Sequence, residues 1–181
     1  GATIQSKVSR YSTLTAAEVA LENAKIADAA AKITALTANS TVAEIGAAKA
    51  AYDALALKSK LNFNDELYAK LVNAVNGVNK IKADAVKALK LTTKSSAKKG
   101  SITVKWTVKG DASVADGYQV WKSTKQSKGY KKAITTTKKS YKNTKGLKKG
   151  TRYYYKVRAY KVVDGKKVYS DWSNKAYRVA K

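Results

Sequence analysis

The strongest constraint on the fold is a stretch with a period of two that begins at Tyr153. From there to Ala159, tyrosine, valine and alanine occupy the odd positions, while lysine, arginine and tyrosine occupy the even ones. A β-strand points alternate side chains to opposite faces. We therefore predict a strand over residues 151–163 that buries its odd-numbered side chains. Its exposed face then displays rings and cations: Arg152, Tyr154, Lys156, Arg158 and Tyr160.

Six further segments have the alternation or the composition of strands. Asp116-Gly117 and Asp164-Gly165 are turn signals, and the second is typical of a hairpin. The complete set of predicted strands is 88–93, 101–107, 118–121, 129–137, 140–144, 151–163 and 175–179. These seven segments predict an all-β domain over residues 88–181.

In residues 1–87, a recurring sequence motif marks the predicted starts of helices. Thr15 and Glu18 have the spacing of a capping box, in which a hydroxyl and a carboxylate satisfy the first free amides of a helix. Thr41 and Glu44 repeat this spacing, and a third helix is predicted to begin near Asn64. Three helices are therefore expected before the first strand.

The apolar residues of these helices recur at helical spacing. The predicted buried faces include Val19, Ile33, Val42, Ile45, Leu71, Val78 and Ile81. Short polar turns between helices favour an antiparallel arrangement. We predict two domains, an all-α antiparallel three-helix bundle over residues 1–87, with residues 1–12 frayed, and the all-β domain over residues 88–181.

Charge is distributed very unevenly along the chain. Residues 1–89 hold 11 basic and 8 acidic side chains, whereas residues 90–181 hold 26 basic and 4 acidic ones, out of a formal net charge of +25. Only four of the basic residues are arginines. Lysine is a hydrated point charge, which suits diffuse attraction to a polyanion better than the reading of bases. We expect nucleic acid to bind only non-specifically.

The composition argues against most catalytic chemistry. Histidine and cysteine are absent, which excludes disulfides, thiol nucleophiles and metal clusters built from these residues. The carboxylates of the second half lie in predicted turns without an evident pair: Asp111, Asp116, Asp164 and Asp171. We expect no enzymatic activity, no cofactor and no metal. No apolar segment approaches the length of a membrane span, so we expect no membrane insertion, and we expect a monomer.

Residues 88–181 resemble a fibronectin type III domain. The motifs that carry the resemblance are Ile102-x-Val104-x-Trp106 for strand B, Gly117-Tyr-x-Val120 for strand C, and Leu147-x-x-Gly-Thr-x-Tyr153 with Val157-Arg-Ala159 for strand F. The resemblance implies a seven-strand β-sandwich in which Leu147 plugs the core and the Tyr153 hydroxyl bonds back to the backbone as a tyrosine corner. Lys149 replaces the usual proline of this motif, and no Arg-Gly-Asp loop is present.

The source of such a chain is also suggested by resemblance. The lysine-rich and tyrosine-rich sandwich is similar to modules of large secreted or surface proteins of Gram-positive bacteria. The helical part is similar to alanine-rich helical repeats of the same proteins through residues 14–18 and 47–55. These likenesses imply an extracellular or cell-surface location.

The segment Tyr169-Ser-Asp-Trp-Ser173 resembles a motif of cytokine-receptor fibronectin domains, in which rings interleave with cations of strand F. The resemblance implies that Tyr169 and Trp172 sandwich Lys156 and Arg158. Such contacts stabilise a protein by roughly 0.5 to 1 kcal/mol each when they are exposed.

The best candidate binding site is this aromatic and cationic face. Its predicted members are Trp121, Tyr154, Lys156, Arg158, Tyr160 and Trp172. One interpretation is that the rings and cations contact a sugar polymer or an acidic protein loop. The other is that they stack on one another and cover the sheet.

Three functions remain open at the level of sequence. The first is a non-catalytic adhesion or binding module of a bacterial extracellular protein, with a cationic aromatic sheet suited to anionic glycans, cell-wall polymers or a host glycoprotein. The second is a structural spacer stalk that positions an enzyme or adhesin domain. The third is a module that binds a host protein such as an immunoglobulin through its helix faces.

Overall fold

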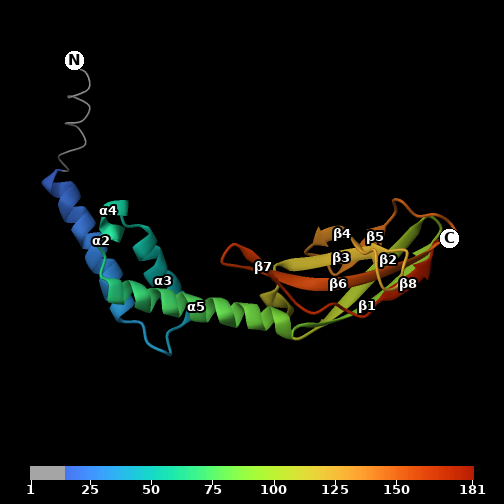
Figure 1. The fold of residues 1–181 in the computed structure, drawn as a ribbon, viewed down its shortest axis with the longest axis horizontal. Coiled ribbons are helices and arrows are strands. Elements are labelled where there is room, and N and C mark those ends of the chain that lie inside the picture. Colours follow the sequence, from blue (N-terminus) through green and yellow to red (C-terminus); the bar gives the residue numbers. More distant parts are fainter. Residues whose placement is uncertain (1–14) are drawn as a thin grey trace, which may run out of the picture. The chain divides into compact units, whose positions relative to one another are not determined.

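The computed structural model describes residues 15–181 (Figure 1). The expected fraying of residues 1–12 lies outside the described residues. The chain divides into two compact units between Val78 and Asn79, inside one helix. We call them the helical unit and the sandwich unit.

The described residues form four α-helices: α2 (Ala16–Thr34), α3 (Val42–Asp53), α4 (Leu57–Leu61) and α5 (Asp65–Ala88). Both predicted capping boxes are present. The Thr15 hydroxyl accepts the amide of Glu18 at 3.2 Å, and the Glu18 carboxylate accepts the amide of Thr15 at 2.6 Å. Thr41 and Glu44 repeat the pattern at 3.2 and 2.7 Å. The two predicted helix starts are therefore confirmed.

The expected number of three helices is corrected by the short helix α4. The chain leaves helical geometry at Ala56, whose φ and ψ of −60° and 153° are extended. There the backbone amide of Ala56 donates to the carboxylate of Glu22 in α2 at 2.7 Å. This bond to a distant helix accompanies the break, and a separate turn of helix begins at Leu57.

The core of the helical unit joins residues from α2, α3 and α5 with the loops between them. Its buried members are Ala29, Ile33, Leu36, Ile45, Ala48, Leu55, Phe63, Leu71 and Val78. Val19 and Val42, which the helical period assigned to buried faces, are exposed because they lie in the first turns of their helices. Ile81 is also exposed, since it lies on α5 beyond Val78, the last residue of this core.

The sandwich unit contains eight strands. They are β1 (Lys90–Lys98), β2 (Ser101–Lys109), β3 (Gly117–Ser123), β4 (Lys131–Thr136), β5 (Ser140–Asn143), β6 (Arg152–Val163), β7 (Lys166–Tyr169) and β8 (Ala176–Val179). One sheet has the order β1-β2-β5, and the other has the order β4-β3-β6-β7, with β8 also paired to β6. All pairs are antiparallel. In this order β6 lies between β3 and the last two strands (Figure 1).

The predicted count of seven strands is corrected at the end of the chain. β7 pairs with residues 160–163 of β6, and β8 pairs with residues 152–155 of the same strand. The two short strands are thus halves of one edge strand that is interrupted by residues 170–175. This interruption is built by serine side chains, as described below.

The predicted register of β6 is confirmed. Tyr155, Val157 and Ala159 are completely buried, whereas Lys156 and Arg158 between them are partly exposed. The buried residues of the sandwich core are Val86, Leu89, Leu91, Ile102, Val104, Trp106, Tyr118, Val120, Tyr153, Tyr155, Val157, Ala159 and Ala180. The apolar parity of the sequence therefore faces the interior between the two sheets.

The tyrosine corner is present. The Tyr153 hydroxyl donates to the carbonyl of Gly146 at 3.1 Å and accepts the backbone amide of Lys148 at 2.9 Å. Leu147 packs against the core between them. Gly150 has a φ of 79°, a left-handed conformation that favours glycine. The turn before β6 is therefore held by the hydroxyl and the glycine, with Lys149 in place of the usual proline.

Tyr155 gives the sandwich a dependence on alkaline pH. Its side chain is fully buried, the Asn143 amide donates to its hydroxyl at 2.8 Å, and burial raises its pKa to about 12. An unfolded tyrosine has a pKa of about 10, so the buried phenol stabilises the fold fully below pH 10. This contribution is lost as the pH rises from about 10 towards about 12.

Ionisation of Tyr155 alone is expected to lower the free energy of unfolding by about 2 kcal/mol between about pH 8 and about pH 11.5. Urea unfolding of the protein and of Tyr155→Phe at pH 8 and at the alkaline pH measures the effect. The variant lacks the Tyr155 phenol but keeps every lysine that titrates in this range. Its free energy of unfolding should therefore fall by about 2 kcal/mol less than that of the unchanged protein. Equal losses in the two proteins would contradict the assignment.

Candidate functional site

A stack of alternating rings and cations lies on the outer face of the sheet that contains β6. We call it the ring-cation ladder and define it by Tyr169, Arg158, Trp172, Lys156 and Tyr130. The Arg158 guanidinium lies 3.5 Å from the centre of the Tyr169 ring and 4.5 Å from that of Trp172. The Lys156 ammonium lies 4.1 Å from Trp172 and 4.6 Å from Tyr130. Each cation is thus held between two rings, as the resemblance implies for Arg158.

Strand register places the cations of the ladder. Lys156 and Arg158 are alternate residues of β6, and they lie opposite Trp121 and Gln119 of β3. Trp172 comes from the segment between β7 and β8. Its ring meets that of Trp121 edge to face, with centroids 5.7 Å apart.

Arg158 is fixed by hydrogen bonds as well as by rings. Its Nε and Nη2 atoms donate to the side-chain oxygen of Gln119 at 3.1 and 2.9 Å. Gln119 is only 4% exposed, so its oxygen depends on this partner. Burial lowers the pKa of Arg158, although an arginine keeps its charge at neutral pH. The ring faces offset part of the cost of removing this charge from water.

Lys156 lies in a similar environment. Burial, followed by the nearby charges of Lys175 and Arg158, lowers the pKa of its ammonium group. Among residues 15–181, neither Lys156 nor Arg158 forms an ion pair with a carboxylate. Lys156 is held by aromatic faces, and Arg158 is held by aromatic faces together with the Gln119 side-chain oxygen.

Two serines build the segment that carries Trp172. The Ser170 hydroxyl accepts the backbone amide of Ala159 at 2.9 Å, and the Ser173 hydroxyl accepts that of Val157 at 3.0 Å. The amides of the same serines donate to the carbonyls of Ala159 and Val157 at 3.1 and 2.8 Å. Side-chain oxygens thus replace strand carbonyls as partners of β6, which allows the edge strand to leave regular pairing and to hold Trp172 over the sheet.

This segment also ties the two sheets together. The hydroxyl of Thr93 in β1 donates to the Ser173 hydroxyl at 2.8 Å. The Asn174 side chain accepts the amide of Thr93 at 2.7 Å and donates to its carbonyl at 2.9 Å. The position of Trp172 is therefore set by both halves of the sandwich.

The structure brings together four of the six predicted site residues: Trp121, Lys156, Arg158 and Trp172. Tyr154 lies apart, with its ring 5.7 Å from that of Tyr177, and Tyr160 contacts the ammonium of Lys167 at 4.6 Å. Tyr130 and Gln119 were not predicted. Tyr130 falls within the predicted strand 129–137, but it lies just before β4 in the structure, and no sequence pattern indicates that its ring reaches Lys156. The position of Gln119 opposite Arg158 follows once β3 and β6 are paired.

The contacts of the ladder limit what it can bind. The faces of Trp172 are already occupied by Lys156 and Arg158. A sugar that stacked on this ring would have to displace one of the two cations. The ladder therefore stabilises the sheet through its own contacts, and the predicted binding role of its residues stays a prediction.

Two carboxylates of the sandwich unit, Asp116 and Asp171, form ion pairs with lysines. Asp116 accepts the Lys161 ammonium at 2.6 Å and the Val162 amide at 2.7 Å, and these bonds hold its pKa below the ordinary value. Asp171 pairs with Lys90 at 2.8 Å. Within residues 15–181, no three histidine, cysteine or acidic side chains are grouped to hold a metal ion. No helix of that range is both long and apolar enough to cross a membrane.

Comparison with known proteins gives fold likenesses only. No protein-family model and no curated protein sequence matches the chain. A β-1,2-glucanase from Parabacteroides distasonis is 22% identical over 52% of this chain and 13% of its own, with a TM-score of 0.43. An Fn3-like protein from Clostridium thermocellum is 26% identical over 53% of this chain and 95% of its own, with a TM-score of 0.40.

A fibronectin type III domain of the human fibronectin type III domain containing protein 3 is 19% identical over 49% of this chain and 84% of its own, with a TM-score of 0.38. The strand order and the tyrosine corner, rather than these likenesses, make the sandwich unit fibronectin type III-like.

Proposed function

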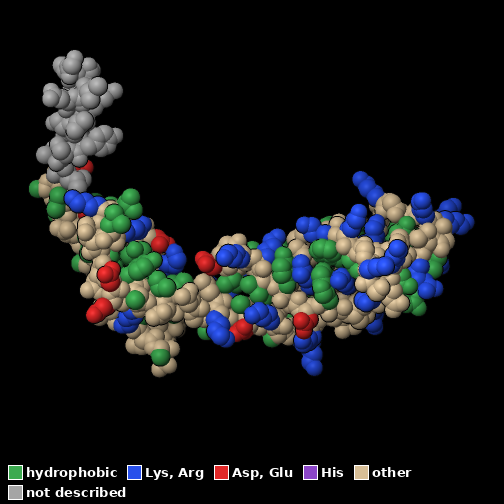
Figure 2. Space-filling model, viewed as in Figure 1, with side chains coloured by type: hydrophobic (Ala, Val, Ile, Leu, Met, Phe, Trp, Pro, Cys, Tyr) green, Lys and Arg blue, Asp and Glu red, His purple; other side chains and the backbone are tan. Residues whose placement is uncertain are grey.

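We propose that this chain is a non-catalytic adhesion module of a bacterial extracellular or cell-surface protein, which binds anionic glycans or cell-wall polymers through its sandwich unit. The observation that carries the proposal is an excess of unpaired positive charge. Residues 90–181 hold 26 basic and 4 acidic side chains, and their ion pairs are Lys90 with Asp171 and Lys161 with Asp116. Figure 2 shows lysine and arginine side chains spread over the visible face of this unit.

The electrostatics favour a polymer over a single small ion. Exposed lysines are separate point charges, and each attracts an anion only weakly in water. A chain of regularly spaced anions engages several lysines at once and releases its own counterions when it does so. The ladder supports this function indirectly, because its ring-cation contacts stabilise the sheet against the repulsion among its many positive charges.

Binding should therefore depend steeply on salt. With about five lysines engaged, the affinity for heparin is expected to fall roughly a hundredfold between about 50 and 200 mM sodium chloride. Isothermal titration calorimetry of the full chain measures it, with uncharged dextran as the control polymer. Affinity that is indifferent to salt, or equal for dextran, would contradict the electrostatic proposal.

A second function is favoured by one feature of the helical unit. Leu57 and Leu61, four residues apart on α4, are 74% and 77% exposed, as expected of side chains that contact another protein. A host protein such as an immunoglobulin is the proposed partner in this case. Its binding would persist at high salt, which distinguishes it from adhesion to a polyanion. A spacer role would show neither kind of binding.

A further inference from the structure

The sheet β1-β2-β5 has a polar outer face that does not belong to the ladder. Strand pairing places Lys94 directly opposite Lys105, and Thr92 directly opposite Thr107. All four side chains are exposed, whereas their neighbours Thr93 and Trp106 are buried. This face therefore presents two threonine hydroxyls beside two ammonium groups.

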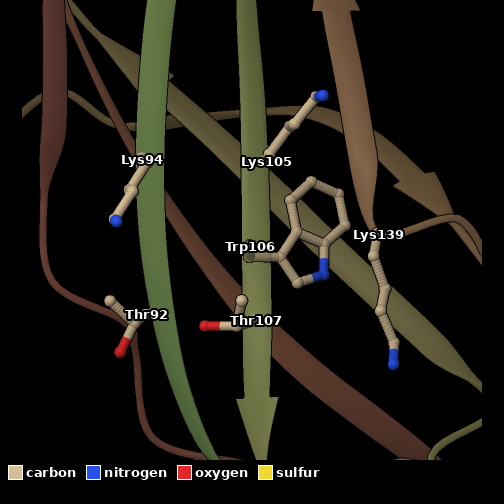
Figure 3. Close-up of a pocket in the computed structure, with 6 residues that line it drawn as sticks. All are labelled: Thr92, Lys94, Lys105, Trp106, Thr107 and Lys139. Carbon is tan, nitrogen blue, oxygen red and sulfur yellow. The ribbon is translucent and has the colours of Figure 1, made fainter.

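A hollow lies on this face next to the start of β5. It has a volume of about 420 Å³ and is lined by Thr92, Lys94, Lys105, Trp106, Thr107 and Lys139 (Figure 3). β5 begins only at Ser140, which is paired with Lys105, so beyond this point β2 has no strand on that side. The backbone there is held by one bond, from the Trp106 amide to the Lys139 carbonyl at 3.2 Å.

The lysines of the hollow lack negative partners. Within the described part of the chain, Lys94, Lys105 and Lys139 form no ion pair. The sequence has no acidic residue between Lys90 and Gly110 or between Gly117 and Val163. Lys94 and Lys105 are directly opposite in the strand register, and Figure 3 shows their ammonium groups pointing away from each other. Like charges at directly opposite positions repel. An anion bound in the hollow would therefore reduce the repulsion among these lysines.

Trp106 provides an independent sign of a missing ligand. Its side chain is only 3% exposed, and its indole nitrogen is buried without a hydrogen-bond partner among the described residues. Buried donors without partners are rare in folded proteins. Figure 3 shows this nitrogen on the side of the ring that faces Lys139, whose side chain is exposed. Movement of the flexible Lys139 chain would open the donor to an oxygen atom in the hollow.

We propose that this hollow binds one acidic sugar residue of an anionic polysaccharide. Figure 3 shows the ammonium groups of Lys94, Lys105 and Lys139 pointing in different directions, so these long side chains turn towards the acidic group when it binds. One oxygen of that group accepts the Trp106 indole hydrogen. Thr92 and Thr107 exchange hydrogen bonds with sugar hydroxyls, because each threonine hydroxyl both donates and accepts. The proposal rests on the proposed function, since it names where the polymer is held.

The lining favours a sugar over other anions. A volume of about 420 Å³ is large for an inorganic anion alone and lies within the range of small-molecule sites. Single-stranded nucleic acids bind through bases that stack on exposed rings, and the only ring of this hollow is buried. Hydroxyls and ammonium groups without an open ring face match an acidic sugar better.

Nuclear magnetic resonance gives a direct test, because the chain has three tryptophans and hence three indole NH signals. Trp121→Phe and Trp172→Phe assign the signals by elimination. Titration of the full chain with tetragalacturonate at low salt is expected to shift the Trp106 signal and to leave the other two in place. An unmoved Trp106 signal under saturating binding would overturn the site.

Charge variants distinguish binding at the hollow from attraction by the overall positive charge of the protein. Lys94→Gln, Lys105→Gln and Lys139→Gln combined should weaken tetragalacturonate binding at least about tenfold. The matched control combines Lys125→Gln, Lys149→Gln and Lys166→Gln, which removes the same charge from exposed positions elsewhere, and should weaken it less than about threefold. Equal effects would overturn the site while leaving the proposed function intact.

Two other outcomes are decisive. If neither heparin nor tetragalacturonate binds at low salt, the proposed function fails and this site fails with it. If inorganic phosphate or an oligonucleotide shifts the Trp106 signal at lower concentration than the sugar does, the assignment to an acidic sugar is wrong.

Discussion

Replacing Trp172 by alanine is expected to lower the free energy of unfolding by about 3 kcal/mol. The ring contacts Lys156, Arg158 and Trp121, so one truncation removes the centre of the ladder. Without it, two neighbouring cations lose the aromatic face that separates them. Truncation of a buried tryptophan costs about 3 to 5 kcal/mol, and the partial exposure of Trp172 places it near the lower end.

Urea unfolding at low and at high salt measures this loss. Tyr177→Ala is the matched control, because Tyr177 is an exposed ring at the edge of the same sheet that contacts Arg152 and Tyr154 but none of the ladder. We expect the control to lose about 1 kcal/mol or less. A Trp172→Ala variant as stable as the control would show that the ladder contributes little to the fold.

The sandwich was predictable where the signal is local. The parity of β6 assigns each side chain to a face, and burial of Tyr155 and Val157 follows that parity. The tyrosine corner depends on residues five to seven positions apart, so its motif is visible in the sequence. Capping boxes are equally local, and both are formed as predicted.

Features set by distant contacts were not predictable in the same way. The break before α4 coincides with a bond between Glu22 and Ala56, which are 34 residues apart. The interruption of the last strand depends on hydroxyls of Ser170 and Ser173 that reach the backbone of β6. The hydrophobic period of a segment does not show that Glu22 will bond to Ala56, or that Ser170 and Ser173 will bond to β6.

The candidate site shows a limit of parity arguments. Tyr154 and Tyr160 share the outer face with Lys156, which is the reason they were grouped with it. Residues of a strand rise about 3.3 Å each, so these two tyrosines lie about 20 Å apart along β6. Parity gives the face of a sheet but not the distance along it. The ladder is therefore centred on Lys156 and Arg158. Its outermost ring, Tyr130, lies in the segment between β3 and β4.

The cations on the two outer faces of the sandwich differ in whether they already have partners. Lys156 and Arg158 are held by rings, and their contacts are complete without a ligand. Lys94 and Lys105 occupy opposite positions of β1 and β2 and form no ion pair among the described residues. A binding surface needs charges of the second kind, because only these gain new contacts when an anion arrives. The unpaired lysines of the first sheet are thus better placed for adhesion than the ladder.

Removing the Ser170 and Ser173 hydroxyls together is expected to destabilise the sandwich by about 3 kcal/mol. The double variant Ser170→Ala, Ser173→Ala leaves the buried amides of Ala159 and Val157 without partners, and each such loss costs about 1 to 3 kcal/mol. Ser173 also accepts the Thr93 hydroxyl, so its removal loosens the tie between the sheets. Both serines are buried, which limits the access of replacement water.

Urea unfolding measures the total loss, and Ser96→Ala with Ser140→Ala is the control, since both of these serines are exposed and make no side-chain hydrogen bond within residues 15–181. Amide hydrogen exchange then locates the cause. The amides of Val157 and Ala159 should exchange faster in the double variant relative to that of Tyr155, which lies in the same strand but bonds elsewhere. Unchanged protection of Val157 and Ala159, or a loss no larger than that of the control, would show that the serines do not hold the interrupted strand in place.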